Sequence, residues 1–135
     1  MRMLKVKRAY ERKEASDGKR ILVDRLWPRG LRAEDAAVDE WRKDLSPSED
    51  LRKWFNHEPE KWEEFRRRYK EELSSHEKKQ LLERIADEAA NSDVTIVYGA
   101  RETRYNNARV LEELIGQLIK SKSLRRMGAR SFLFL

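Results

Sequence analysis

The stretch DVTIVYGA, residues 93–100, decides the fold because it is the clearest strand signal in the chain. Its β-branched residues favour extended backbone, and Gly99-Ala100 marks the end of the strand. Two earlier segments also predict strands. Residues 3–9, MLKVKRA, alternate apolar and basic side chains, as a strand with one buried face does. The apolar start of ILVDRLW at 21–27 indicates a strand buried on both faces, after a turn at Asp17-Gly18.

The segments between these strands carry apolar residues at helical spacing. Val38, Trp41 and Leu45 predict one helix face. The run 46–49, SPSE, predicts the start of the next helix, with Ser46 as cap, Pro47 at the first helical position and Glu49 completing a capping box. Pro59 opens a further predicted helix. The predicted buried stripes of these and later helices are Leu51, Trp54 and Phe55; Trp62, Phe65, Tyr69 and Leu73; Leu81, Leu82, Ile85 and Ala89; and, over 107–120, Leu111, Leu114, Ile115 and Leu118.

Strands that alternate with helices favour parallel pairing through right-handed crossovers. We therefore predict a single α/β domain over residues 1–135, a small three-layer sandwich with a short, mostly parallel central sheet and several flanking helices. The last stretch, SLRRMGARSFLFL at 123–135, suits a short strand or a loose tail, and we favour a loose tail over about the last 12 residues.

The composition limits the classes of function. Of 135 residues, 41% are charged, and 31 Lys and Arg against 25 Asp and Glu give a formal net charge of +6. A polyanionic or phosphorylated partner is therefore plausible, although the charges are interleaved. The absence of cysteine excludes a disulfide framework, a thiolate nucleophile and a zinc–sulfur site. With no long apolar run, we expect no membrane partner and a cytoplasmic location.

Two polar segments follow predicted strands, at the edge where open parallel sheets bind ligands. One is DRLWPRG at 24–30, and the other is YGARETRYNN at 98–107. If the topology is as predicted, these segments converge on one cleft. We predict site residues in both segments, namely Asp24, Arg25, Trp27, Arg29, Tyr98, Arg101, Glu102, Asn106 and Asn107.

These residue types suit a nucleotide-like or phosphate-bearing ligand. Arg25, Arg29 and Arg101 can hold a phosphate or carboxylate in bidentate fashion, and a helix start at Asn106 or Asn107 offers backbone N–H groups to an anion. Trp27 or Tyr98 can stack on a base or sugar. Asp24 or Glu102 can act as a catalytic base or orient a hydroxyl. Asp44 and Lys53 are weaker additions.

Each residue also has a structural interpretation. Asp24 and Arg25 can pair with other charges, Trp27 and Tyr98 can be core residues, residues 28–30 can be only a turn, and Asn106 can merely cap a helix. The run EEFRRRYK at 63–70 is better explained as a helix face with Glu–Arg pairs than as a nucleic-acid surface. His57 and His76 stand apart from other metal-ligating residues, so we predict no metal site. No sequence motif indicates a particular cofactor.

The sequence resembles the YeaO-like family of small bacterial and archaeal proteins, a domain of unknown function. The resemblance rests on SDGKRILVDRLWPRGL at 16–31, DEWRKDLSPSEDLRKWFNHEPEKWEEFRRRY at 39–69 and TIVYGARETRYNNARVLEELI at 95–115. It implies a cytoplasmic single-domain α/β protein and no established activity. Many members of that family read N-H-A where this chain has Asn106-Asn107-Ala108, so chemistry that needs a histidine at position 107 is missing here.

Three hypotheses follow for the function. The leading one is a small enzyme or binding protein for a nucleotide-like or phosphate-bearing ligand in the cleft. The second is a nucleic-acid-binding module without catalysis. In the third, DRLWPRG is a structural network of ion pairs and a turn. The sequence does not distinguish an enzyme from a binding protein, and it does not define an oligomeric state.

Overall fold

The computed structural model describes the backbone of residues 4–133 and the side chains of residues 4–125. It contains a sheet of β1 (Leu4–Arg8), β2 (Lys19–Leu22), β3 (Glu40–Trp41) and β4 (Val94–Tyr98). The strand order is β1-β4-β2-β3, and every pairing is parallel. The predicted α/β class with a parallel central sheet is therefore confirmed.

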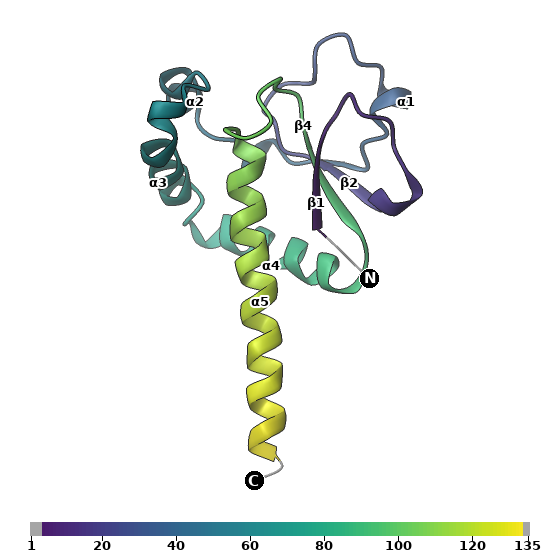
Figure 1. The fold of residues 1–135 in the computed structure, drawn as a ribbon, viewed down its shortest axis with the longest axis vertical. Helices are drawn as coiled ribbons and strands as arrows, with labels where there is room; N and C mark the ends of the chain where they lie inside the picture. Colours follow the sequence, from purple (N-terminus) through teal and green to yellow (C-terminus); the bar gives the residue numbers. More distant parts are fainter. Residues whose placement is uncertain (1–3, 134–135) are drawn as a thin grey trace.

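Helical segments make up most of the remaining structure. The α-helices are α1 (Ala33–Ala36), α2 (Glu49–Phe55), α3 (Trp62–Glu72), α4 (His76–Asn91) and α5 (Asn107–Leu133), and the 3₁₀ turns are η1 (Ala15–Asp17), η2 (Lys43–Leu45) and η3 (Pro59–Lys61). Figure 1 shows α2 and α3 beside the upper part of α5, and α4 passing behind it. The far end of α5 extends beyond the rest of the fold. The backbone is helical through Leu133, where the sequence predicts a loose tail; residues 134 and 135 lie outside the described part.

Strand β4 lies between β1 and β2 in the sheet, and all of its residues are buried. Val94, Ile96 and Tyr98 belong to the larger core, which the helices α2 to α5 cover. Val97 packs in a smaller cluster on the other face with Leu22. A strand buried on both faces needs apolar side chains at consecutive positions, which explains the continuous run in DVTIVYGA.

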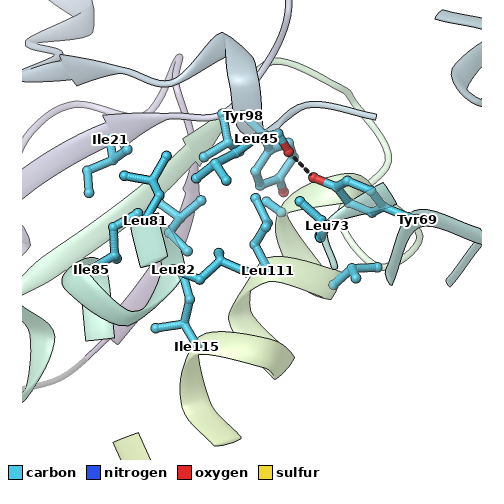
Figure 2. Close-up of a cluster of buried hydrophobic side chains, with 14 of the residues drawn as sticks. Ile21, Leu45, Tyr69, Leu73, Leu81, Leu82, Ile85, Tyr98, Leu111 and Ile115 are labelled. Atoms are coloured by element: carbon cyan, nitrogen blue, oxygen red, sulfur yellow. Dashed lines mark hydrogen bonds between the residues drawn. The ribbon is translucent and has the colours of Figure 1, made fainter. Parts of the chain in front are cut away.

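The larger core joins the sheet to the helices (Figure 2). The predicted stripe residues Phe65, Tyr69, Leu82 and Ile85 are buried in it. The Tyr69 hydroxyl donates a hydrogen bond to the carbonyl of Leu45, so the polar end of this fully buried ring is satisfied. Helical periodicity therefore identified the core-facing residues of α3 and α4 correctly.

The predicted helix through Val38, Trp41 and Leu45 is wrong. Glu40 and Trp41 pair with β2 as strand β3, and the Arg42 N–H donates to the Leu22 carbonyl at 2.7 Å. Trp41 packs edge-on against the Trp27 ring at 5.4 Å in the smaller cluster, whereas Leu45 enters the larger core. The apolar residues at helical spacing therefore do not share one helix face, because Val38 and Trp41 pack in the smaller cluster and Leu45 packs in the larger core.

The predicted cap of α2 is also wrong. The hydroxyl of Ser48 caps this helix, because it accepts a hydrogen bond from the Leu51 N–H at 3.2 Å. The hydroxyl of Ser46 donates instead to the Lys43 carbonyl at 2.6 Å, at the end of η2. Pro47 lies between the two serines, outside the helix. Two serines flank the proline. Ser46 bonds back to η2, and Ser48 is the one that caps the helix.

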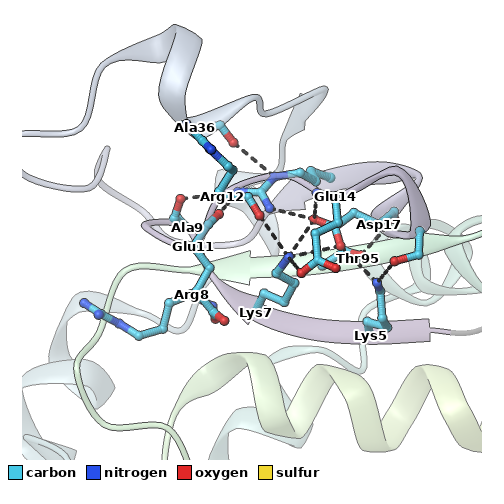
Figure 3. Close-up of polar contacts among 12 residues, drawn as sticks. Lys5, Lys7, Arg8, Ala9, Glu11, Arg12, Glu14, Asp17, Ala36 and Thr95 are labelled. Carbon is cyan, nitrogen blue, oxygen red and sulfur yellow. Dashed lines mark hydrogen bonds and ion pairs between the residues drawn. The ribbon is translucent and has the colours of Figure 1, made fainter.

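A buried ion cluster holds the amino-terminal side of the sheet together (Figure 3). The Asp17 carboxylate contacts Lys5 at 2.9 Å, Lys7 at 3.0 Å and Arg20 at 2.9 Å, and the side chains of Asp17 and Arg20 are both 0% exposed. Burial alone raises the pKa of Asp17, but hydrogen bonds from the lysines, the Glu14 N–H and Arg20 outweigh it and hold that pKa well below its ordinary value. The cluster therefore links η1 to both β1 and β2.

Replacing Asp17 by asparagine should destabilise the fold by about 3 kcal/mol at neutral pH, because three cations lose their buried counter-charge. The depressed native pKa means that this stabilisation is present above the unfolded value, about 4, and is lost as the pH falls below it. Urea unfolding at several pH values measures the effect. The difference in the free energy of unfolding between wild type and variant should become smaller in acid.

The matched control is Asp35→Asn, since Asp35 forms an exposed ion pair with Arg32 at 3.2 Å. An exposed pair of this kind contributes about 0.5 kcal/mol or less. Equal losses in the two variants, or a gap that stays constant down to pH 3, would contradict the structural role given to Asp17.

Candidate functional site

A cavity of about 330 Å³ lies at the carboxyl ends of β2 and β4. The segment 24–29, the residues 99–100 after β4 and the first residue of α5 all contribute to its lining. The linker before α2 and the turn after it complete the wall. The two polar segments predicted to converge therefore do meet, although only part of the second one faces the cavity.

Asp24 joins the two segments. Its Oδ2 accepts a hydrogen bond from the Gly99 N–H at 2.7 Å, and its Oδ1 accepts one from the Asn107 Nδ2 at 3.3 Å. Burial raises the pKa of the Asp24 carboxyl, and these hydrogen bonds oppose the shift. A Cβ at position 99 would stand 3.1 Å from Oδ2, so glycine lets the backbone come this close to the carboxyl.

Asn107 connects this carboxyl to the larger core. Its Nδ2 also donates to the Val23 carbonyl at 3.1 Å, which fixes the first residue of α5 against the end of β2. The Tyr69 hydroxyl lies next to the same amide; burial raises the pKa of Tyr69, and the nearby Asp24 and Glu72 charges add to the increase. Asp24 and Asn107 line the cavity, and the Tyr69 hydroxyl lies next to them in the larger core.

Arg8, at the end of β1, and Tyr10, just after it, form hydrogen bonds with the two loops that line the cavity. The Tyr10 hydroxyl donates to the Arg29 carbonyl at 2.7 Å, and the Arg8 guanidinium donates to the Ala100 carbonyl at 2.9 Å. Arg8 also lies 4.8 Å from the centre of the Tyr10 ring. The loop after β2 and the loop after β4 are thereby both bonded to the end of β1. Both contacts are made to backbone carbonyls, so the Tyr10 contact does not use the Arg29 guanidinium.

Three arginines line the cavity from different parts of the chain: Arg25, Arg29 and Arg52. Within the described side chains none of them forms an ion pair, and Arg25 makes one long hydrogen bond, 3.4 Å, to the Pro47 carbonyl. Other exposed arginines, such as Arg84, also lack a pair. What distinguishes these three is that they converge on one cavity whose lining contains a single carboxyl group, that of Asp24.

Several aromatic rings line the cavity. The Trp27 ring is fixed by its Nε1, which donates to the Leu31 carbonyl at 2.6 Å. Phe55 and Phe65 are stacked at 4.1 Å, and the His57 ring meets Phe55 edge-on at 5.4 Å. The His57 Nδ1 lies 2.9 Å from the Tyr105 carbonyl, which accepts a hydrogen bond from it. A flat ligand group in the cavity would therefore meet aromatic surface.

Four predicted site residues do not line the cavity: Tyr98, Arg101, Glu102 and Asn106. Tyr98 is buried in the core and Arg101 is exposed. The Glu102 carboxylate accepts from the Arg104 and Tyr105 N–H groups at 2.8 and 3.2 Å, and these hydrogen bonds lower its pKa. The Asn106 Oδ1 accepts from the Arg109 N–H at 3.2 Å in the first turn of α5. The last two therefore shape the turn before α5.

The rest of the lining consists of residues outside the predicted site, among them Tyr10, Ser46, Arg52, Phe55, His57 and Phe65. Phe55 and Phe65 carried a core pattern, and they do belong to the core as well as the cavity wall. His57 has a left-handed backbone with φ 54°, directly after Asn56 with φ 45°. Such a backbone often marks a tight turn after a helix, but nothing in the sequence places that turn opposite residues 24–29.

The described residues contain no group of three or more His, Cys, Asp or Glu side chains able to hold a metal ion. Across the same part of the chain, no helix has the length and apolar character that crossing a bilayer requires.

Comparison with known families places the chain. The family described as "Inactive DUF488-N3 subclade" matches residues 3–131. The chain belongs to this family. It is 45% identical over 115 residues to the uncharacterized protein YeaO of Escherichia coli, which covers 85% of this chain and 98% of that protein. It is 42% identical over 112 residues to the uncharacterized protein Rv3073c of Mycobacterium tuberculosis, over 83% of this chain and 92% of that protein. No solved structure matches it.

The comparison confirms the resemblance to a YeaO-like family of unknown function. These relatives are uncharacterized, so the family does not assign a ligand or reaction to the cavity. Residues 24, 99 and 107 all fall inside the matched region.

Replacing Asn107 by alanine should raise the pKa of Asp24 further, because it removes a hydrogen bond that favours the carboxylate. A carbon-detected NMR titration of the aspartate carboxyl groups would measure the change directly. Asn91→Ala is the control, since its amide donates to the Asp87 carbonyl on the exposed side of α4. An Asp24 pKa that is unchanged or lower in the Asn107 variant would show that the amide does not govern this carboxyl.

Proposed function

We propose that the cavity binds a small anionic ligand of nucleotide type, and that the chain acts as a binding protein rather than an enzyme. The observation that carries the proposal is the convergence of Arg25, Arg29 and Arg52 on one cavity, without an ion pair among the described side chains. Guanidinium groups match the geometry of phosphate and carboxylate oxygens. A ligand anion supplies the counter-charge that the protein side chains do not.

The rest of the lining suits a ligand with a flat ring and a hydroxyl group. The rings of Trp27 and Phe55 both offer apolar surface in the cavity lining. The Asp24 carboxyl, already held by Gly99 and Asn107, retains lone pairs to accept a hydrogen bond from a ligand hydroxyl. A nucleoside phosphate combines a ring, hydroxyl groups and an anion, and the cavity volume lies at the lower end of ligand pockets, about 300 to 1,000 Å³.

Two observations favour binding over catalysis. The family that matches the chain is described as inactive. In addition, Asn107 stands where the YeaO-like resemblance implies a histidine in many members. Its amide donates a hydrogen bond to Asp24 and cannot transfer a proton at neutral pH. Glu102, the other predicted base, faces the turn before α5 and is not part of the proposed site.

The nucleic-acid-binding module and the purely structural role of DRLWPRG fit these contacts less well. The net charge of +6 motivated a nucleic-acid-binding module, but the most basic run, at 66–68, is paired with glutamates. Asp24 does have a structural role through Gly99, yet it lines the cavity, as does Arg29, which has no ion pair among the described side chains. Steep salt dependence with long nucleic acids and no affinity for mononucleotides would favour the nucleic-acid module.

Arg29→Ala and Arg52→Ala should each weaken binding of nucleoside 5′-monophosphates by about tenfold, since each removes one charge-assisted contact. Isothermal titration calorimetry at low salt, with inorganic phosphate alongside the nucleotides, would measure the affinities. Both arginine side chains are exposed, so the variants should fold normally.

Arg32→Ala is the matched control because Arg32 is exposed, lies three residues beyond Arg29 and pairs with Asp35 outside the cavity. Its affinity should equal that of the wild type. Undiminished binding in both cavity variants, or no binding of phosphate or any mononucleotide by the wild type, would refute the proposal.

A further inference from the structure

A second hollow of about 460 Å³ adjoins the first cavity. The two share Arg25 and Ser46 in their linings, so Arg25 stands at the border between them. The remaining charged residues of the second hollow are Lys43, Asp44, Glu72 and Lys78. The site therefore continues past the first cavity, along the linker before α2 and towards the start of α4.

The cations of the second hollow are available to a ligand. Neither Lys43 nor Lys78 forms an ion pair within the described side chains. The Lys43 Nζ lies 4.1 Å from the centre of the Trp41 ring, a contact that orients an ammonium group without neutralising it. Together with Arg25 they place three positive charges around one hollow.

The two carboxylates of the hollow oppose these charges unequally. Both oxygens of Glu72 are engaged, since they accept from the Ser48 N–H at 2.8 Å and the Ser48 hydroxyl at 2.6 Å. Glu72 thereby fixes the start of α2 and has less capacity to bind either lysine. Asp44 is exposed, so water screens its charge. The balance favours a second anionic group in this hollow.

We infer that the ligand is longer than a mononucleotide, and that it is a 5′-phosphorylated dinucleotide whose second phosphate binds between Arg25, Lys43 and Lys78. The inference rests on the proposed function of the first cavity. A nucleotide in that cavity would direct its linking phosphate towards Arg25, because Arg25 is the one cation that both linings contain. The second nucleotide then occupies the adjoining hollow.

The test compares 5′-phosphorylated dinucleotides with the corresponding 5′-mononucleotides by calorimetry at low salt. The wild type should bind the dinucleotide about tenfold more tightly, which is what two cation–phosphate contacts near the surface supply. Lys43→Ala and Lys78→Ala should each reduce that preference severalfold while leaving the mononucleotide affinity unchanged. Lys79→Ala is the control, because Lys79 is the neighbour of Lys78 on α4 but does not line the hollow.

The outcomes separate this inference from the proposed function. Mononucleotide binding without a preference for the dinucleotide, or a preference that survives both lysine variants, would overturn the inference and leave the first cavity intact. No binding of either ligand would overturn both. Affinity that keeps rising with each added nucleotide up to an octamer would point to non-specific contact along the surface and would also overturn the inference.

Discussion

The Asp24 carboxyl is the contact on which the arrangement of the site depends. It accepts hydrogen bonds from Gly99, just after β4, and from Asn107, the first residue of α5. The chain segments that follow β2 and β4 are far apart in sequence, and this side chain joins them, together with the hydrogen bond from the Asn107 amide to the Val23 carbonyl. A Cβ at position 99 would crowd the carboxyl, so glycine suits the close approach. These satisfied polar groups help to hold the two segments beside the cavity.

Asp17 and Asp24 show two ways of accommodating a carboxyl group at opposite ends of β2. Asp17 is surrounded by three cations, and its pKa is lowered; that arrangement stabilises the charged form and binds β1 to β2. Among the described side chains Asp24 forms no ion pair although three arginines line the same cavity, and burial raises its pKa. The arginines of the cavity therefore keep their positive charge without a partner carboxylate in the described part of the chain, which is what the proposed anion binding requires.

Local patterns in the sequence predicted most of the fold. The strands over 94–98 and 4–8, and the core stripes of α3 and α4, follow from residue type and periodicity. Strand β3 did not, because two residues are too few for a period and Trp41 is held by packing on Trp27 and a hydrogen bond to the Asp24 carbonyl. Tertiary contacts of this kind override local preference.

The predicted site residues also fall into two groups, those that line the cavity and those that do not. In the segment after β2, the predicted residues Asp24, Arg25, Trp27 and Arg29 line the cavity, at the edge where parallel sheets bind ligands. That they bind a ligand stays a prediction. Of the predicted residues in the second segment, Asn107 lines the cavity beside Gly99 and Ala100, whereas Glu102 and Asn106 form contacts in the turn before α5 and in its first turn. Arg52 and His57 come from α2 and the turn after it, and their position depends on how the helices pack on the sheet. No local pattern encodes that packing.

Binding and proton transfer make different demands on a cavity of this kind. Anion binding needs unpaired guanidinium groups and shaped walls, which depend on residues 25–29, 52 and the aromatic rings. Proton transfer needs a group that titrates near neutral pH at the right atom, and an amide at position 107 does not. The same amide still performs the structural task of holding Asp24 and the Val23 carbonyl. Under the proposed function, position 107 therefore serves the arrangement of the cavity rather than proton transfer.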